Sequence, residues 1–113
     1  MYSMVTTAIA RGLESVYVQV EADVSDGMPV FEMVGFLSSE VKEARERVRT
    51  ALHSCGFKIP VKRITVNLSP ADVRKSGSGF DLPIAVAVLA ALGEVDGKFL
   101  EGSLVVGEIS LSS

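Results

Sequence analysis

Residues 75–93 read KSGSGFDLPIAVAVLAALG, a loop of glycine and serine that leads directly into an almost wholly apolar segment. The alanine content of this segment and the stop at Gly93 favour a helix over a strand. Asp81 is placed to cap the first turn, and Pro83 is tolerated there because its missing N–H would be unpaired anyway. A helix that is apolar on every side must be buried on most sides. The sequence therefore predicts a central helix in the core.

The loop before this helix is in a position where many proteins bind phosphate. A P-loop needs Gly-x4-Gly-Lys followed by Ser or Thr, whereas Gly77 and Gly79 are followed here by Phe80 and Asp81. The third glycine of a dinucleotide-binding loop is also missing. We therefore expect this chain to bind no nucleotide cofactor and to hydrolyse no ATP.

A serine nucleophile is the second possible use of the loop. Lys75 could activate Ser76 or Ser78, and the surrounding glycines would leave room for a substrate. Serines are common in flexible loops, however, and neighbours in sequence are not thereby within reach of each other. If the loop is catalytic, Ser78 and Lys75 are the candidate residues. The alternative is that the loop only connects two elements of the fold.

Two segments at the start of the chain alternate apolar and polar residues, as strands with one buried face do. One side of SVYVQVEADV, residues 15–24, carries Val16, Val18, Val20 and Ala22. With residues 3–12, this segment predicts an antiparallel pair around Gly12. Further strands are predicted at residues 30–36, 59–69 and 102–111. The predicted order is βββαβαβ, an α+β sheet with helices on one face.

Residues 38–56, SSEVKEARERVRTALHSCG, predict the clearest helix. Ser38 can cap its first turn, and Gly56 is a favoured terminator. One apolar stripe recurs at intervals of three and four residues: Val41, Ala44, Val48, Ala51 or Leu52, and Cys55. The stripe predicts that Cys55 lies in the core, whereas His53 lies off it and is expected at the surface.

Composition limits the class of protein. A chain of 113 residues and 12.0 kDa is expected to form one domain, residues 1–113. Its longest apolar run, residues 82–92, is too short to span a bilayer. The single Cys55 excludes an internal disulfide and fits a cytoplasmic protein, and with one histidine we expect no metal site.

Positive charge is concentrated in the middle of the chain. Residues 41–75 hold nine Lys or Arg against three Asp or Glu, which gives this segment a net charge of +6. The formal net charge of the whole chain is −3, so the remaining residues carry a net charge of −9. Such asymmetry can mark a surface that faces nucleic acid or another anionic partner, whereas a solvated helix with scattered surface lysines is the favoured interpretation. The candidate binding residues are Arg45, Arg49, Lys58, Lys62, Arg63, Arg74 and Lys75.

Residues 31–93, FEMVGFLSSEVKEARERVRTALHSCGFKIPVKRITVNLSPADVRKSGSGFDLPIAVAVLAALG, resemble the N-terminal domain of the magnesium-chelatase-related, competence-type AAA+ ATPases of bacteria. The resemblance extends from Ala8 to Leu111. It implies a fold shared with the Lon proteolytic domain and a small-subunit ribosomal protein. That fold is a mixed sheet with two helices on one face and a left-handed βαβ crossover.

The resemblance also implies that this chain is a fragment. The parent protein would hold ATP and Mg²⁺ in an AAA+ module of the same chain and would form a hexamer, and some such motors are associated with DNA branch migration in natural transformation. The position of the Lon nucleophile falls at Gly79 or Phe80. We therefore expect a non-catalytic domain that organises subunits or engages a partner or DNA. The alternatives are a nucleic-acid-binding module and a vestigial Ser/Lys peptidase.

Overall fold

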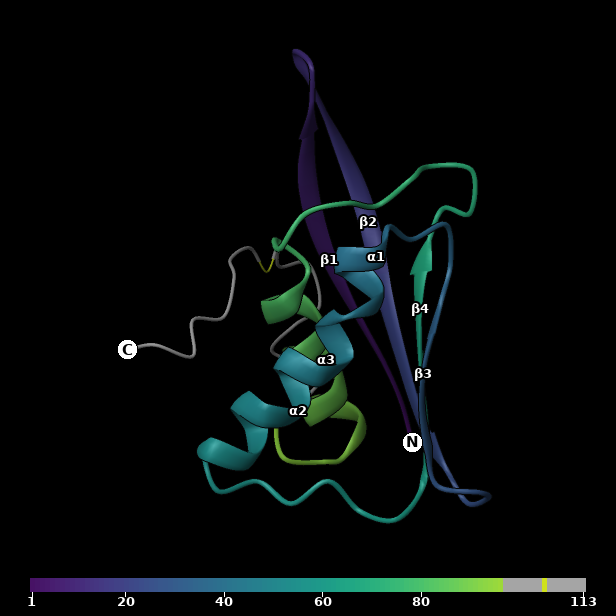
Figure 1. Cartoon of the computed structure of the whole chain (residues 1–113), viewed down its shortest axis with the longest axis vertical. Coiled ribbons are helices and arrows are strands. Elements are labelled where there is room, and N and C mark those ends of the chain that lie inside the picture. Colours follow the sequence, from purple (N-terminus) through teal and green to yellow (C-terminus); the bar gives the residue numbers. More distant parts are fainter. Residues whose placement is uncertain (97–104, 106–113) are drawn as a thin grey trace.

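The computed structural model describes residues 1–96 and 105 and contains a mixed four-stranded sheet (Figure 1). The strands lie in the order β1-β2-β4-β3. Strands β3 and β4 are parallel, and the other pairs are antiparallel. The strands are β1 (Tyr2–Arg11), β2 (Glu14–Ser25), β3 (Val30–Val34) and β4 (Arg63–Ser69). The predicted α+β fold class is confirmed.

The first two strands form the long hairpin that the alternating pattern predicts. Val5 faces Val20 in its register, and Gly12 turns the chain with φ +65°. The inward residues Val18 and Val20 are fully buried, and the hairpin tip projects beyond the helices (Figure 1). Alternation therefore identified the buried face of β2 correctly.

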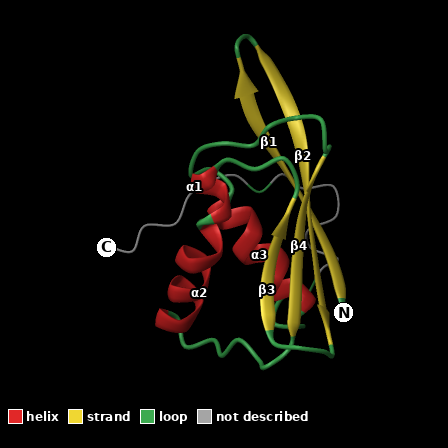
Figure 2. Cartoon of the chain, turned by 45° about the vertical axis from the view of Figure 1, so that its right-hand side comes forward, coloured by secondary structure: helices red, strands yellow, loops and turns green. Residues whose placement is uncertain are grey.

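The helices cover one face of the sheet (Figure 2). They are α1 (Ser39–Lys42), α2 (Ala44–Ser54) and α3 (Asp81–Ala91). Helix α3 lies against β1 and β2, and its Ile84 and Val88 are fully buried, as its apolar sequence predicts. No helix in the described part of the chain has the length and apolar character needed to span a membrane.

The predicted helix at residues 38–56 is interrupted at Glu43, between α1 and α2. Ser38 caps α1 as expected, because its hydroxyl accepts a bond from the Val41 N–H at 3.2 Å. The burial predicted for Cys55 is wrong: Cys55 follows the last residue of α2 and is exposed. His53 is exposed, as expected.

Strands β3 and β4 are parallel neighbours joined through α1 and α2, so they form a βαβ unit. The handedness of its crossover stays a prediction. Strand β4 begins at Arg63 rather than at residue 59, because Pro60 has no N–H to donate to a ladder. The strand predicted at residues 102–111 lies outside the described residues except for Val105, whose N–H donates to the Thr6 carbonyl at 3.0 Å.

Candidate functional site

The loop at residues 70–80 connects the end of β4 to the start of α3, and its backbone is fixed at Lys75. The Lys75 N–H donates to the Phe36 carbonyl at 2.8 Å, and the Lys75 carbonyl accepts from the Ser38 N–H at 2.9 Å. These bonds form a parallel bridge between Lys75 and Leu37. The middle of the loop is therefore attached to the segment that leads from β3 into α1.

The side chain of Lys75 is fully buried, and its Nζ donates to the Pro70 carbonyl within the same loop. Burial lowers the pKa of Lys75, and the nearby charge of Asp72 offsets part of this effect. A buried lysine with a lowered pKa has the chemistry of a general base. Here, however, its hydrogen bond holds the loop together.

The burial of Lys75 corrects one sequence prediction. A fully buried ammonium cannot contact the phosphates of a nucleic acid at the surface, so Lys75 does not belong to the anion-binding set. Of the two candidate nucleophiles, Ser76 is exposed, whereas Ser78 is partly buried and its carbonyl accepts from the Asp81 N–H at 3.3 Å.

The other end of the loop is held by Asp81. Its carboxylate is buried and accepts two bonds from Arg47 of α2, at 2.6 Å from Nε and 2.9 Å from Nη2. The capping role predicted for Asp81 is therefore wrong: Phe80 occupies the N-cap position, and no side chain caps α3. The carboxylate instead ties the start of α3 to α2.

Arg47 makes a further bond that extends this connection. Its Nη2 donates to the Glu40 carbonyl of α1 at 2.9 Å. The hydrogen bond to Asp81 raises the pKa of Arg47, so the guanidinium stays charged. One side chain thus joins α1, α2 and α3. Sequence reasoning missed this contact because Arg47 and Asp81 are 34 positions apart in the sequence.

The remaining basic candidates come from both ends of β4 and from α2. Arg74 follows the end of β4, whereas Lys58, Lys62 and Arg63 lie before or at its start. Arg45 and Arg49 are on α2. Three of these residues have carboxylate partners: Arg63 with Glu32 at 3.2 Å, Lys62 with Asp26 at 3.1 Å, and Arg45 with Glu46 at 3.8 Å.

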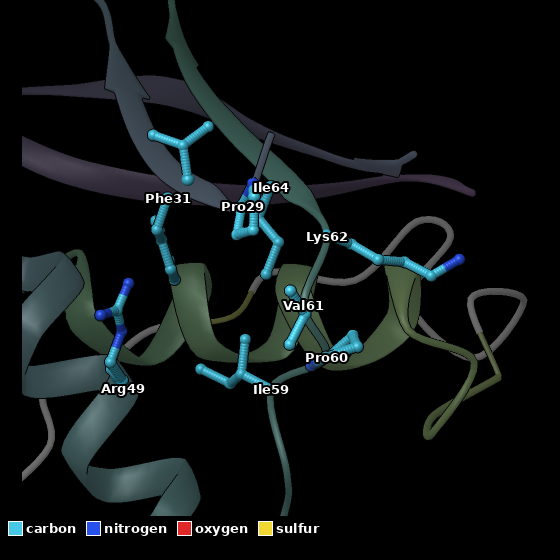
Figure 3. Close-up of a pocket in the computed structure, with 9 residues that line it drawn as sticks. Pro29, Phe31, Arg49, Ile59, Pro60, Val61, Lys62 and Ile64 are labelled. Carbon is cyan, nitrogen blue, oxygen red and sulfur yellow. The ribbon is translucent and has the colours of Figure 1, made fainter. Parts of the chain in front are cut away.

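A pocket of about 280 Å³ lies beside the start of β3, near several of these residues (Figure 3). Its lining residues are Pro29, Val30, Phe31, Arg49, Ile59, Pro60, Val61, Lys62 and Ile64. The Arg49 Cζ lies 5.8 Å from the centre of the Phe31 ring, whereas the Lys62 ammonium points away from the pocket (Figure 3). Sequence reasoning missed this pocket. The sequence feature that could have indicated the pocket is a proline beside apolar residues in each of two segments, at Pro29 and Pro60.

No group of three or more His, Cys, Asp or Glu side chains within residues 1–96 and 105 is arranged to hold a metal ion. The fold and the loop together define a small α+β unit in which the loop before α3 is held by backbone and side-chain hydrogen bonds.

The chain belongs to the family described as subunit ChlI of magnesium chelatase, whose sequence model matches residues 20–113. It is 44% identical over 110 residues to the uncharacterized protein YifB of Escherichia coli and to the competence protein ComM of Haemophilus influenzae. Both alignments cover 97% of this chain and 22% of the relative. The chain therefore spans about a fifth of the length of these relatives, and its resemblance to their family's N-terminal domain is confirmed.

Proposed function

We propose that the chain is a non-catalytic domain of a cytoplasmic, magnesium-chelatase-related AAA+ ATPase. In this proposal it organises subunits or engages a partner, while an AAA+ module of the same protein binds ATP and Mg²⁺. The observation that carries the proposal is the double fixation of the loop. Lys75 is bonded to the Pro70 carbonyl, and Asp81 is bonded to Arg47, so neither is free to act on a substrate.

The action of the parent protein is proposed from its relatives. We infer a motor that acts on DNA, in the form of a hexamer that migrates DNA branches; the family resemblance of the sequence supports this inference, and one relative is named a competence protein. This domain would contribute to that assembly without performing the chemical step.

Assays for hydrolysis test the non-catalytic role. The purified 113-residue chain should hydrolyse neither ATP nor fluorogenic peptides, and a serine-directed fluorophosphonate should label it no more than the Ser78→Ala variant. Labelling that depends on both Ser78 and Lys75, with peptide turnover, would instead identify a working Ser/Lys peptidase. Ser78→Ala is a suitable control because it removes the only candidate hydroxyl that is partly buried in the loop.

Direct binding of nucleic acid is the second candidate function. Its support is that Arg49, Lys58 and Arg74 are exposed and that none of the ion pairs between described residues involves them. Because phosphate contacts release counterions, affinity for single-stranded or forked DNA would fall steeply with salt. Charge reversal at Lys58 and Arg74 should then abolish binding in fluorescence anisotropy. Absence of binding at low salt would leave partner engagement as the role of the domain.

A further inference from the structure

We propose that the pocket beside β3 is a docking site for an extended peptide segment of a partner protein, one in which a bulky apolar residue neighbours a carboxylate. The inference deepens the proposed function, because it rests on partner engagement and gives that role a place and a ligand class. Three features support it: the shape of the pocket, the charge of Arg49 and the free edge of β3.

The pocket has the size and lining of a site for one or two side chains. Its volume of about 280 Å³ lies just below the range of roughly 300–1,000 Å³ usual for sites that hold a whole small molecule. Phe31 and Ile64 form a buried apolar floor, and Pro29 and Pro60 restrict the backbone around it. Val61 is 81% exposed, so apolar surface remains to be covered.

Arg49 supplies a positive charge that has no local counterpart. Its guanidinium lies over the Phe31 ring, with Cζ 5.8 Å from the ring centre, and no carboxylate within residues 1–96 and 105 lies at salt-bridge distance from it. Lys62, by contrast, already has Asp26 as a partner and points away from the pocket. A carboxylate that follows an apolar residue into the pocket would therefore find an available guanidinium.

Strand β3 offers backbone groups beside the same pocket. It is an edge strand of the described sheet, and the Val30 N–H points toward β4, where it donates to the Lys62 carbonyl at 3.4 Å. Backbone groups alternate in direction along a strand, so those of Phe31 and Met33 point away from β4. An extended peptide can pair with such an edge and place alternate side chains in pockets.

The bond from Arg45 supports this direction of the edge. Its Nη1 donates to the Phe31 carbonyl at 3.5 Å, a long bond to an acceptor that faces away from β4. A peptide N–H can replace so weak a contact. Arg45 could then pair with a second carboxylate of the peptide. Its present partner Glu46 is 65% exposed, so the existing ion pair is weak and easily exchanged.

The same features disfavour a nucleic acid in this pocket. In proteins that bind single-stranded nucleic acids, the bases stack on accessible aromatic rings. Phe31 is only 3% exposed and lies beneath Arg49. One guanidinium at the pocket also provides few phosphate contacts. The apolar lining and the strand edge are features that a peptide uses and a nucleic acid does not.

Fluorescence anisotropy with synthetic peptides tests the proposal. The probe is a fluorescein-labelled heptapeptide of alternating Leu and Glu, and the comparison peptides replace Glu by Lys, Leu by Ser, or the central residue by Pro. We expect the Leu/Glu peptide to bind, and each comparison peptide to bind roughly tenfold more weakly or not at all. Proline should weaken binding because it removes a ladder N–H.

Variants of the chain locate the site. Arg49→Glu should weaken the Leu/Glu peptide roughly tenfold or more and improve binding of the Leu/Lys peptide, whereas Arg11→Glu, at the exposed end of β1, should change neither. Circular dichroism checks that each variant folds, and Arg49→Gln provides a neutral substitution. In amide NMR spectra, the N–H signals of Phe31 and Met33 should shift and exchange more slowly with solvent when the peptide binds.

Four results would overturn the proposal: no binding of the Leu/Glu peptide, equal losses in Arg49→Glu and Arg11→Glu, shifts that omit β3, or a pocket that binds single-stranded DNA instead of peptide. None of them bears on whether the domain is catalytic. Conversely, ATP or peptide hydrolysis by the chain would refute the non-catalytic role and leave peptide docking intact, so the two failures are distinguishable.

Discussion

Replacing Asp81 by Ala should destabilise the domain by about 3 kcal/mol. The change removes two charge-assisted hydrogen bonds, each worth about 1.5–3 kcal/mol, and leaves the Arg47 guanidinium without its partner. Removing one member of a buried pair costs about 3–5 kcal/mol, and we take the lower end because the Arg47 side chain is 27% exposed and can regain water. At about 4 °C or more per kcal/mol, Tm should fall by roughly 12 °C or more.

Urea unfolding of Asp81→Ala, Arg47→Met and the double variant measures the coupling between the two residues. We expect a coupling energy of about 2 kcal/mol. Asp26→Ala is the matched control: it breaks an ion pair whose carboxylate is 95% exposed and should cost about 0.5 kcal/mol or less. If Asp81 were only a helix cap, its loss would cost about 1 kcal/mol and coupling to Arg47 would be near zero, which would refute our reasoning.

Four further substitutions test other features of the fold. Burial lowers the pKa of Lys75 from 10.5, so the unfolded chain binds the Lys75 proton more tightly than the folded chain does. The free energy of unfolding should therefore rise as the pH increases from the pKa of the folded state toward 10.5. In urea titrations at several pH values, Lys75→Met should remove this rise. Gly35→Ala should cost about 2 kcal/mol in urea unfolding, because φ is +137° and the new Cβ would lie 2.7 Å from the Leu68 carbonyl oxygen. Gly12→Ala, with φ +65° and open space, should cost about 1 kcal/mol, and similar losses at the two glycines would contradict the close contact. Exposed Cys55 should react with a thiol reagent in the folded protein, and Cys55→Ser should lower the free energy of unfolding by less than about 0.5 kcal/mol. Protection of Cys55 from the reagent would show instead that this side chain is buried.

The elements that sequence predicted well are those whose burial follows a local period. Alternation in β2 identified Val18 and Val20 as buried, and the apolar composition of α3 identified a central helix. Each of these elements packs against the core, so the spacing of its apolar residues is enough to specify which side chains are buried.

Prediction failed where burial depends on segments that are distant in sequence. A lysine in a polar loop is usually exposed, whereas Lys75 is fully buried in a loop that is bridged to Leu37, a residue distant in the sequence. The stripe of the long helix was followed one residue too far, because α2 ends at Ser54 and Cys55 is exposed beyond that end. Asp81 has the residue type expected of a helix cap, but its carboxylate pairs with Arg47 on another helix.

The candidate pocket and the fixed loop lie at opposite ends of β4, and this separation has a functional consequence. Ile64, near the start of the strand, contributes to the pocket floor, whereas Pro70, just after its end, accepts the bond from Lys75. Substitutions at Arg49, on the exposed rim, can therefore change partner binding without breaking the bonds that hold the loop. Substitutions at Asp81 should reduce stability first and affect binding only through unfolding. A domain built in this way can vary its partner surface while keeping the internal joint that positions its helices.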